Sequence, residues 1–243
     1  MLRRQASQSL KELVRHVALK IGYGNFLDYR REKLGVKTTH LRKATVESRF
    51  QSIYATGAWV NTDSQKALSG LGSELSATSN IRQLLPSVVS ALQVTSIVDV
   101  GCGDWTWMKE LNLPCHYLGV DVVSEVILSN SKHTSNNVAF MQLNAISEPL
   151  PNADAALCRE VLFHLSFEDS LKVLNNIKNT SKFLIATTND LWFNSDIRTG
   201  DFRNINLCRP PYSFPSPLLT ICDDGVSQGR VIGVWRTSSI LVV

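Results

Sequence analysis

The 243-residue sequence has no run of about 18 or more apolar residues, so it predicts no membrane-spanning helix. Its five cysteines form no C-x-x-C pair, which argues against both a zinc site and a disulfide framework. The five histidines lack H-x-x-x-H or similar ligand spacing. We therefore expect no protein-bound metal, and a reducing, cytoplasmic compartment is the simplest location.

An excess of positive charge is confined to the first 50 residues of the chain. Residues 1–50 hold 12 Lys and Arg against 4 Asp and Glu, so the remaining 193 residues carry a net charge of −4 within the total of +4. A surface that tracks nucleic-acid phosphates should be basic near the active site. The mildly acidic body makes a nucleic-acid partner unlikely.

The basic segment also carries an apolar stripe with helical spacing. The stripe consists of Leu10, Leu13, Val14, Val17, Ala18 and Ile21. Lys11, Arg15 and Lys20 flank it. Three interpretations stay open: a helix that packs on the body or on a partner protein, a membrane-surface helix, and an organelle-targeting presequence.

The rest of the chain alternates between strand-like and helix-like segments. Residues 22–60 show no clear periodicity, and a helical pattern then runs from residue 78 to 92. Strands are expected at residues 96–100, 117–121, 138–143, 153–158 and 183–187, and helices at 105–111, 124–131 and 169–177. This alternation predicts a parallel sheet with helices on both faces. Two final strands, 218–222 and 231–235, enclose Asp224-Gly225 and predict an antiparallel hairpin.

These patterns divide the chain into three parts. We expect a basic amphipathic N-terminal arm (1–50), a lid or entry segment (51–77) and a catalytic domain (78–243). The stretch Ser69-Gly70-Leu71-Gly72-Ser73 is flexible enough to close over a ligand, and Tyr54 and Trp59 could line its mouth. A plain linker would have the same composition.

The first predicted strand runs into two glycines, in "VDVGCGD". Gly101 and Gly103 allow a sharp turn and expose backbone amides. A dinucleotide site would carry a third glycine where Thr106 stands, so pyrophosphate is disfavoured and a ligand with a zwitterionic amino-acid tail fits better. Asp121 ends the second strand, 18 residues after Gly103, where a carboxylate is placed to accept ribose hydroxyls.

Three motifs, "VDVGCGD", "YLGVD" and "CREVLFHL", resemble those of class I S-adenosylmethionine-dependent methyltransferases. The resemblance covers Thr78 to the C-terminus. It implies an α/β fold: a Rossmann-like, mostly parallel seven-stranded sheet with helices on both faces and a C-terminal antiparallel hairpin, preceded here by the helical arm. The stretches "SGLGSELSATSNI" and "GDFRNINLCRPPYSFPSP" are similar to an uncharacterised branch associated with bacterial polysaccharide genes.

The resemblance implies S-adenosylmethionine as the cofactor and assigns its surroundings. The expected cofactor-binding residues are Asp99, Gly101, Cys102, Gly103, Asp104, Asp121, Val122, Asn144, Ala145 and Arg159. Asp99, Gly101, Gly103 and Asp104 would surround the methionine moiety, Asp121 the ribose, and Asn144 with Ala145 the adenine. The family usually has Asp at position 144, so an Asn that only caps the loop is the alternative.

Two residues after the fourth strand are candidates for catalysis. His164 could act as the general base, because an ordinary histidine pKa of about 6.5 suits proton removal at neutral pH. Glu160 could instead be the base, or could bind a cationic acceptor or the cofactor's ammonium group. A packing role for His164 and a simple ion pair between Arg159 and Glu160 are the alternatives.

The connection from residue 189 to 217 is long, and long loops are often functional. Arg203, Asn204 and Asn206 alternate there with apolar residues, so we expect them, with Trp59, to form the acceptor wall. A buried structural loop is the alternative. The favoured function is O-methylation of a small-molecule or glycan acceptor. N- or C-methylation and a non-catalytic cofactor-binding scaffold are alternatives.

Overall fold

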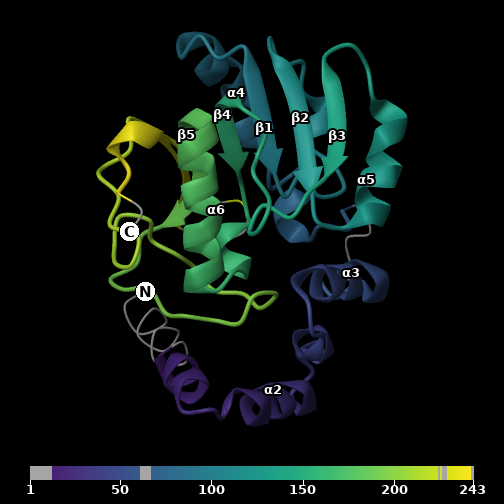
Figure 1. The fold of residues 1–243 in the computed structure, drawn as a ribbon, viewed down its shortest axis with the longest axis vertical. Coiled ribbons are helices and arrows are strands. Elements are labelled where there is room, and N and C mark those ends of the chain that lie inside the picture. The colour runs from purple at the N-terminus through teal and green to yellow at the C-terminus, as the bar shows by residue number, and fades with distance from the viewer. Residues whose placement is uncertain (1–12, 61–66, 224, 226–228, 242–243) are drawn as a thin grey trace.

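The computed structural model describes residues 13–60, 67–223, 225 and 229–241, which form a seven-stranded sheet with flanking helices (Figure 1). The strand order is β3-β2-β1-β4-β5-β7-β6. The strands are β1 (Ser96–Val100), β2 (His116–Asp121), β3 (Val138–Gln142), β4 (Ala153–Cys158), β5 (Ser181–Asn189), β6 (Leu219–Cys222) and β7 (Arg230–Arg236). Within the described residues, no helix is both long and apolar enough to cross a bilayer.

The first five strands are parallel, and the last two close the sheet in the opposite sense. β1 pairs in parallel with both β2 and β4, whereas β7 pairs antiparallel with β5 and β6. The chain reverses its order of strand addition between β1 and β4, and in such sheets ligands bind at the carboxyl ends beside this switch point. The predicted fold class, including the closing hairpin, is confirmed.

Helices cover both faces because each face of the sheet is apolar. α6 (Phe167–Thr180) buries Val173, Leu174 and Ile177 in one core. α4 (Ser79–Ala91) buries Ile81 and Leu85 in the other. α5 (Ser124–Asn130) packs beside β2 and β3.

Two local predictions are wrong. Residues 105–111 do not form an α-helix, because Trp105 has a positive φ of 57° and only a 3₁₀ turn, Met108–Glu110, follows. Residues 22–60 are not irregular: they contain α2 (Gly24–Lys33), a 3₁₀ turn (Thr39–Arg42) and α3 (Val46–Thr56). α3 begins with a capping box between Thr45 and Ser48 and ends at Gly57 in the left-handed conformation.

The first helix of the arm, residues 13–20, packs on the body in an unexpected orientation. Its polar residues face the body: His16 Nδ1 accepts a hydrogen bond from the backbone N–H of Asp196, and Arg15 contacts Asp201. The apolar residues Leu13, Val14, Val17 and Ile21 are 46–64% exposed. Of the three open interpretations, packing on the body is therefore wrong for these four residues of the stripe. Ala18 is buried, and Leu10 lies outside the described residues.

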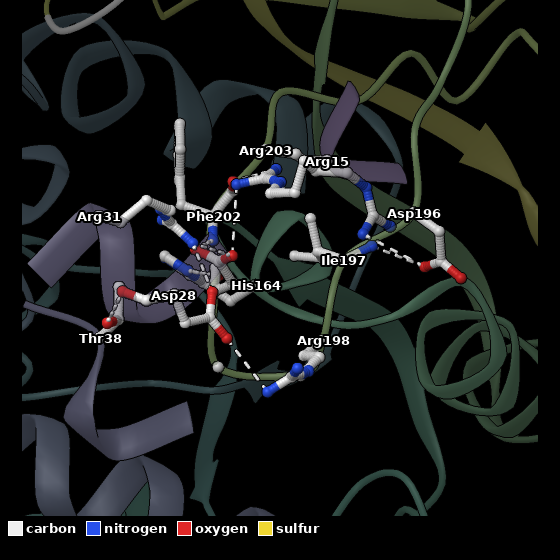
Figure 2. Close-up of polar contacts among 12 residues, drawn as sticks. Arg15, Asp28, Arg31, Thr38, His164, Asp196, Ile197, Arg198, Phe202 and Arg203 are labelled. Carbon is white, nitrogen blue, oxygen red and sulfur yellow. Dashed lines mark hydrogen bonds and ion pairs between the residues drawn. The ribbon is translucent and has the colours of Figure 1, made fainter. Parts of the chain in front are cut away.

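Ionic and hydrogen-bonded contacts join the arm to the loop of residues 196–202 (Figure 2). Arg31 binds both carboxylate oxygens of Asp201, each at 2.8 Å. Arg15 donates to the backbone oxygen of Phe202 at 2.8 Å, and Asp28 pairs with Arg198 at 3.1 Å. These charge-assisted contacts are partly shielded from water, so they hold the loop more firmly than exposed ion pairs would.

Replacing Arg31 with Ala should release the arm from the loop without unfolding the sheet. Losing the bidentate contact with Asp201 should lower the free energy that holds the arm on the loop by about 1–3 kcal/mol. We expect faster limited proteolysis within residues 13–49, with a thermal midpoint close to that of the wild type. Arg30→Ala is the matched control, since Arg30 is the exposed neighbour of Arg31. Equal protease sensitivity of both variants would contradict the clamp.

Candidate functional site

The glycine motif forms a tight bend at the carboxyl end of β1. Gly101 and Gly103 have φ values of 70° and 59°, a region that residues with a Cβ rarely adopt. The backbone amides of Gly101 and Cys102 both donate to the carbonyl of Val120, at 2.8 and 3.0 Å. A Cβ on Gly101 would lie 2.6 Å from Val161 Cγ2. The bend therefore requires glycine for conformation and for space.

Asp121, at the end of β2, fixes this bend. Its Oδ2 accepts a hydrogen bond from Gly103 N and its Oδ1 one from Val123 N, both at 3.0 Å. Burial raises the pKa of Asp121, while these amides oppose the increase. Each carboxylate oxygen can accept a second hydrogen bond, so Asp121 retains acceptor capacity for a ligand.

A cavity lies over the carboxyl ends of β1, β2 and β4, with about 940 Å³ of space including its open mouth. It brings together nine of the ten expected cofactor-binding residues. They are Asp99, Gly101, Cys102, Gly103, Asp121, Val122, Asn144, Ala145 and Arg159. The expectation is wrong for Asp104, whose carboxylate instead accepts from the amides of Leu68, Ser69 and Thr106.

Asp99 is a buried carboxyl group of β1 that lines this cavity. Burial raises the pKa of Asp99 to about 7, although a hydrogen bond from Tyr117 Oη, at 2.6 Å, favours the ionised form. A cationic ligand group placed beside it would favour ionisation. The cavity thus has an acidic group that is poised to respond to positive charge.

The side chain of Asn144 forms hydrogen bonds within its own loop and to the first turn of α3. Its Nδ2 donates to Glu47 Oε1 at 2.5 Å, and its Oδ1 accepts from Ile146 N at 3.0 Å. The contact with Glu47 joins this loop to the first turn of α3. Asn144 therefore performs the capping role, and one lone pair of Oδ1 is left for a ligand.

Four charged side chains form a buried cluster beside the cavity. Arg159 binds Asp223 at 2.9 Å, and Arg230 contacts both Asp223, at 3.0 Å, and Glu160, at 2.6 Å. Two positive and two negative charges balance, as a buried set must. Burial raises the pKa of Asp223, and Arg159 and Arg230 oppose this. The contact of Arg159 with Glu160 is therefore not a plain surface pair.

Glu160 has a positive φ of 61°, which is rare for a residue other than glycine. The backbone of Gly72 packs directly against its carboxylate: a Cβ on Gly72 would lie 1.7 Å from Glu160 Oε2. Gly72 O also accepts from Arg159 Nη1 at 2.8 Å. The predicted lid segment therefore contacts the charged cluster through its own backbone.

Ser69 and Tyr54 connect the lid to the glycine bend. Ser69 Oγ accepts from Asp104 N at 2.8 Å and lies 2.9 Å from Tyr54 Oη. A Cβ on Gly103 would lie 2.4 Å from the same Ser69 oxygen. Both residues line the cavity, as does Trp59.

His164 lies beyond β4, in the 3₁₀ turn Leu162–His164, and lines the cavity. Its Nδ1 is 2.8 Å from the backbone oxygen of Asp201, which can only accept, so Nδ1 carries the proton and Nε2 has a free lone pair. Burial lowers the pKa of His164 to about 4. Its ring stacks on Trp59 with centroids 4.5 Å apart.

A second cavity adjoins the first and shares Trp59, Glu160 and His164 with it. Asn204, which was predicted for the acceptor wall, lines this cavity together with Phe202. The expectations for Arg203 and Asn206 are wrong, because neither lines a described cavity. Arg203 is fully buried and donates to Leu165 O and Tyr212 Oη, while Asn206 bonds the loop backbone at Leu191 and Cys208.

Sequence reasoning missed Asp223 and Arg230. They flank the turn of the closing hairpin, where Asp and Gly residues were interpreted only as turn chemistry. Glu47, Val46 and Phe50 were missed as well, because residues 22–60 showed no helical signal. The adjacent Arg159 and Glu160 were recognised in the sequence, and the Arg next to the turn glycine at 229 was a further signal for the charged cluster.

Comparisons with known proteins agree with this geometry. Residues 98–182 match the family described as "Methyltransferase domain". The N-methyltransferase NodS from Bradyrhizobium japonicum WM9 is similar in structure: TM-score 0.52 and 14% identity, over 68% of this chain and 98% of that chain. The NodS complex with S-adenosyl-L-homocysteine aligns over 44% of this chain and 58% of that one, with 18% identity and a TM-score of 0.39.

The methyltransferase domain of bacterial CtHen1-C aligns at 16% identity over 66% of this chain and 98% of that chain, with a TM-score of 0.48. No curated protein sequence matches. The family match covers residues 98–182, which is part of the predicted catalytic domain, and the NodS alignment confirms the class of fold.

The glycine bend can be tested by comparing Gly101→Ala with Gly35→Ala. Both positions have positive φ, 70° and 85°, but a Cβ at position 35 meets nothing within 4 Å. The conformational cost should be similar, about 1–2 kcal/mol. The clash with Val161 should cost Gly101→Ala a further 1–3 kcal/mol or so. Urea denaturation measures both free energies of unfolding, and equal values would contradict the clash.

Proposed function

We propose that this protein transfers the methyl group of S-adenosylmethionine to a hydroxyl group of a small-molecule or carbohydrate-like acceptor. The methyltransferase domain match and the fold support the reaction class. The observation that carries the proposal is the meeting of the glycine bend, Asp121 and His164 around one cavity.

The residues of the larger cavity suit S-adenosylmethionine. The bend at Gly101–Gly103 leaves room for a close approach of the ligand to bare backbone. The spare acceptor sites of Asp121 suit the two ribose hydroxyls. Asp99 and the Arg159–Glu160 pair offer a carboxyl group and a guanidinium for the ammonium and carboxylate of the methionine tail. Asn144 and Ala145 would lie at the adenine.

S-adenosylmethionine supplies an electrophilic methyl group, whose transfer needs no metal and no covalent enzyme intermediate. The chain's contribution is then chiefly alignment, which can lower the barrier by about 7–11 kcal/mol. The stacked pair of Trp59 and His164 and the neutral Nε2 of His164 lie at the junction of the two cavities. We assign His164 as the base that removes the acceptor's hydroxyl proton. The ordinary pKa of about 6.5 expected from the sequence is wrong, because burial lowers the pKa of His164 to about 4. The ring is therefore neutral and able to accept a proton at neutral pH, although it is a weaker base than an ordinary histidine.

Glu160 is the weaker candidate for the base. Its carboxylate is engaged by Arg230 at 2.6 Å and by Arg159 at 3.4 Å. Both contacts are made by Oε1, so this oxygen is already committed to two guanidinium groups. We assign Glu160 to orienting the charged groups of the cofactor or acceptor.

The second cavity is the proposed acceptor site. Phe202 and Trp59 offer ring faces, and Asn204 offers an amide, a combination that suits a sugar or another polyhydroxylated compound. Its wall belongs to the loop that the arm clamps through Asp201, so the arm holds the acceptor site indirectly.

Replacing Asp121 with Ala should weaken binding of S-adenosylmethionine and S-adenosylhomocysteine at least about a hundredfold. Two hydrogen bonds to a carboxylate contribute roughly 1.5–3 kcal/mol each. Isothermal titration measures the affinity. Asp154→Ala is the control, because Asp154 also accepts from a backbone amide, that of Thr95, but lies outside the cavity. Equal loss in both folded variants, or no binding by the wild type, would reject the cofactor site.

Replacing His164 with Gln should leave cofactor binding intact and lower turnover about 100-fold or more, as expected for loss of a general base. Formation of S-adenosylhomocysteine with a panel of glycans and hydroxylated metabolites is the assay. Because the pKa of His164 is about 4, wild-type turnover should stay constant as pH falls through 6.5 and decline only when the ring protonates near its lowered pKa.

An acidic limb of the pH profile centred near 6.5 would contradict a buried, neutral His164. Turnover with amines but with no hydroxyl compound would show that the methyl group goes to nitrogen and not to oxygen. Cofactor binding without turnover on any acceptor would favour the non-catalytic scaffold.

A further inference from the structure

The N-terminal arm presents its apolar residues to solvent. Leu13, Val14, Val17 and Ile21 are all exposed on the helix of residues 13–20 and its end. The opposite side of this helix is already used, because Arg15 and His16 contact the loop of residues 196–202. Turning the helix over to bury the stripe would break these contacts. The outward orientation is therefore part of the folded structure.

α2 continues the same kind of surface. Tyr23, Phe26, Tyr29 and Leu34 are 53–81% exposed at or near this helix. Its buried charge, Asp28, is turned toward the body and pairs with Arg198. Figure 1 shows α2 and the preceding helix together at the bottom of the view, at the end of the molecule away from the sheet. The two helices thus form an apolar and aromatic end surface.

The exposed charged residues of this end surface are all positive. The exposed charged residues between positions 13 and 37 are Lys20, Arg30, Lys33 and Lys37. The acidic residues of this span, Asp28 and Glu32, are turned inward or paired, Asp28 with Arg198 and Glu32 with Arg42. Apolar and aromatic side chains interspersed with exposed cations match the interface of an anionic bilayer, where rings and aliphatic chains enter the headgroup region and ammonium groups meet phosphates.

We propose that residues 13–37 form a peripheral membrane-docking surface for anionic lipid bilayers. A protein partner would have to bury four cations within an apolar patch, whereas a lipid headgroup layer accepts the cations and the apolar residues at different depths. The inner contacts with Asp201 and Asp196 hold the two helices in place, so the surface is formed before it meets the membrane.

The proposal is tested with the full chain and vesicles of phosphatidylcholine with or without about 30% phosphatidylglycerol, a fraction chosen to give a negative surface potential. Wild-type protein should co-sediment with the anionic vesicles and much less with the neutral ones. Val17→Glu/Ile21→Glu should reduce binding at least about tenfold, since it places charge on the inserting face. Each of Lys20→Gln and Lys33→Gln should weaken anionic binding about fivefold.

Leu128→Glu is the matched control, because Leu128 is 72% exposed on α5, outside the surface. If the Val17→Glu/Ile21→Glu variant has a lowered thermal midpoint, Val17→Ser/Ile21→Ser is used in its place. Absence of wild-type binding to anionic vesicles, or equal binding by the double variants, would overturn the proposal. Self-association of the wild type that the double variants abolish, measured by sedimentation equilibrium without lipid, would instead identify this surface as a contact between copies of the chain.

Discussion

The hydrogen bond from Gly103 N to the Asp121 carboxylate joins the ends of two neighbouring strands and defines the centre of the site. It links the bend after β1 to the end of β2, and Val123 N holds the second carboxylate oxygen. Since both acceptors are buried, losing one would leave an amide without a partner in an apolar setting. The cavity, the position of the lid serine and the approach of any ligand to Gly101 depend on this link.

The proposed acceptor site depends on a different set of contacts, which come from distant parts of the chain. His164 is held by the backbone of Asp201, and the side chain of Asp201 is held by Arg31 and Arg15 of the arm. Burial would raise the pKa of Asp201, but the bond from Arg31 and the charge of Arg15 bring it below its ordinary value. The carboxylate therefore stays ionised, and the arm holds the loop that carries the proposed acceptor wall as an electrostatic clamp.

Local sequence patterns predicted the sheet correctly but failed at residues 105–111 and in the N-terminal arm. Strands β1 and β4 were predicted with their observed bounds, because apolar runs bounded by glycine or charge are unambiguous in a parallel sheet. Residues 105–111 carry helical spacing, yet Trp105 takes a left-handed conformation and the chain cannot continue as a helix. The apolar stripe of residues 13–21 was recognised, but its direction was not, because polar contacts with a loop 180 residues away decide it.

The sequence alone determined where the strands lie along the chain, the glycine bend and the carboxylate at the end of β2, since each rests on residues close together along the chain. Tertiary structure alone decided that Arg203 is buried, that Asp104 accepts from the backbone amides of Leu68 and Ser69, and that Asp223 and Arg230 complete the charge balance around Glu160. The reason is physical: a buried polar group must find a partner, and the folded arrangement of distant segments decides which partner it finds.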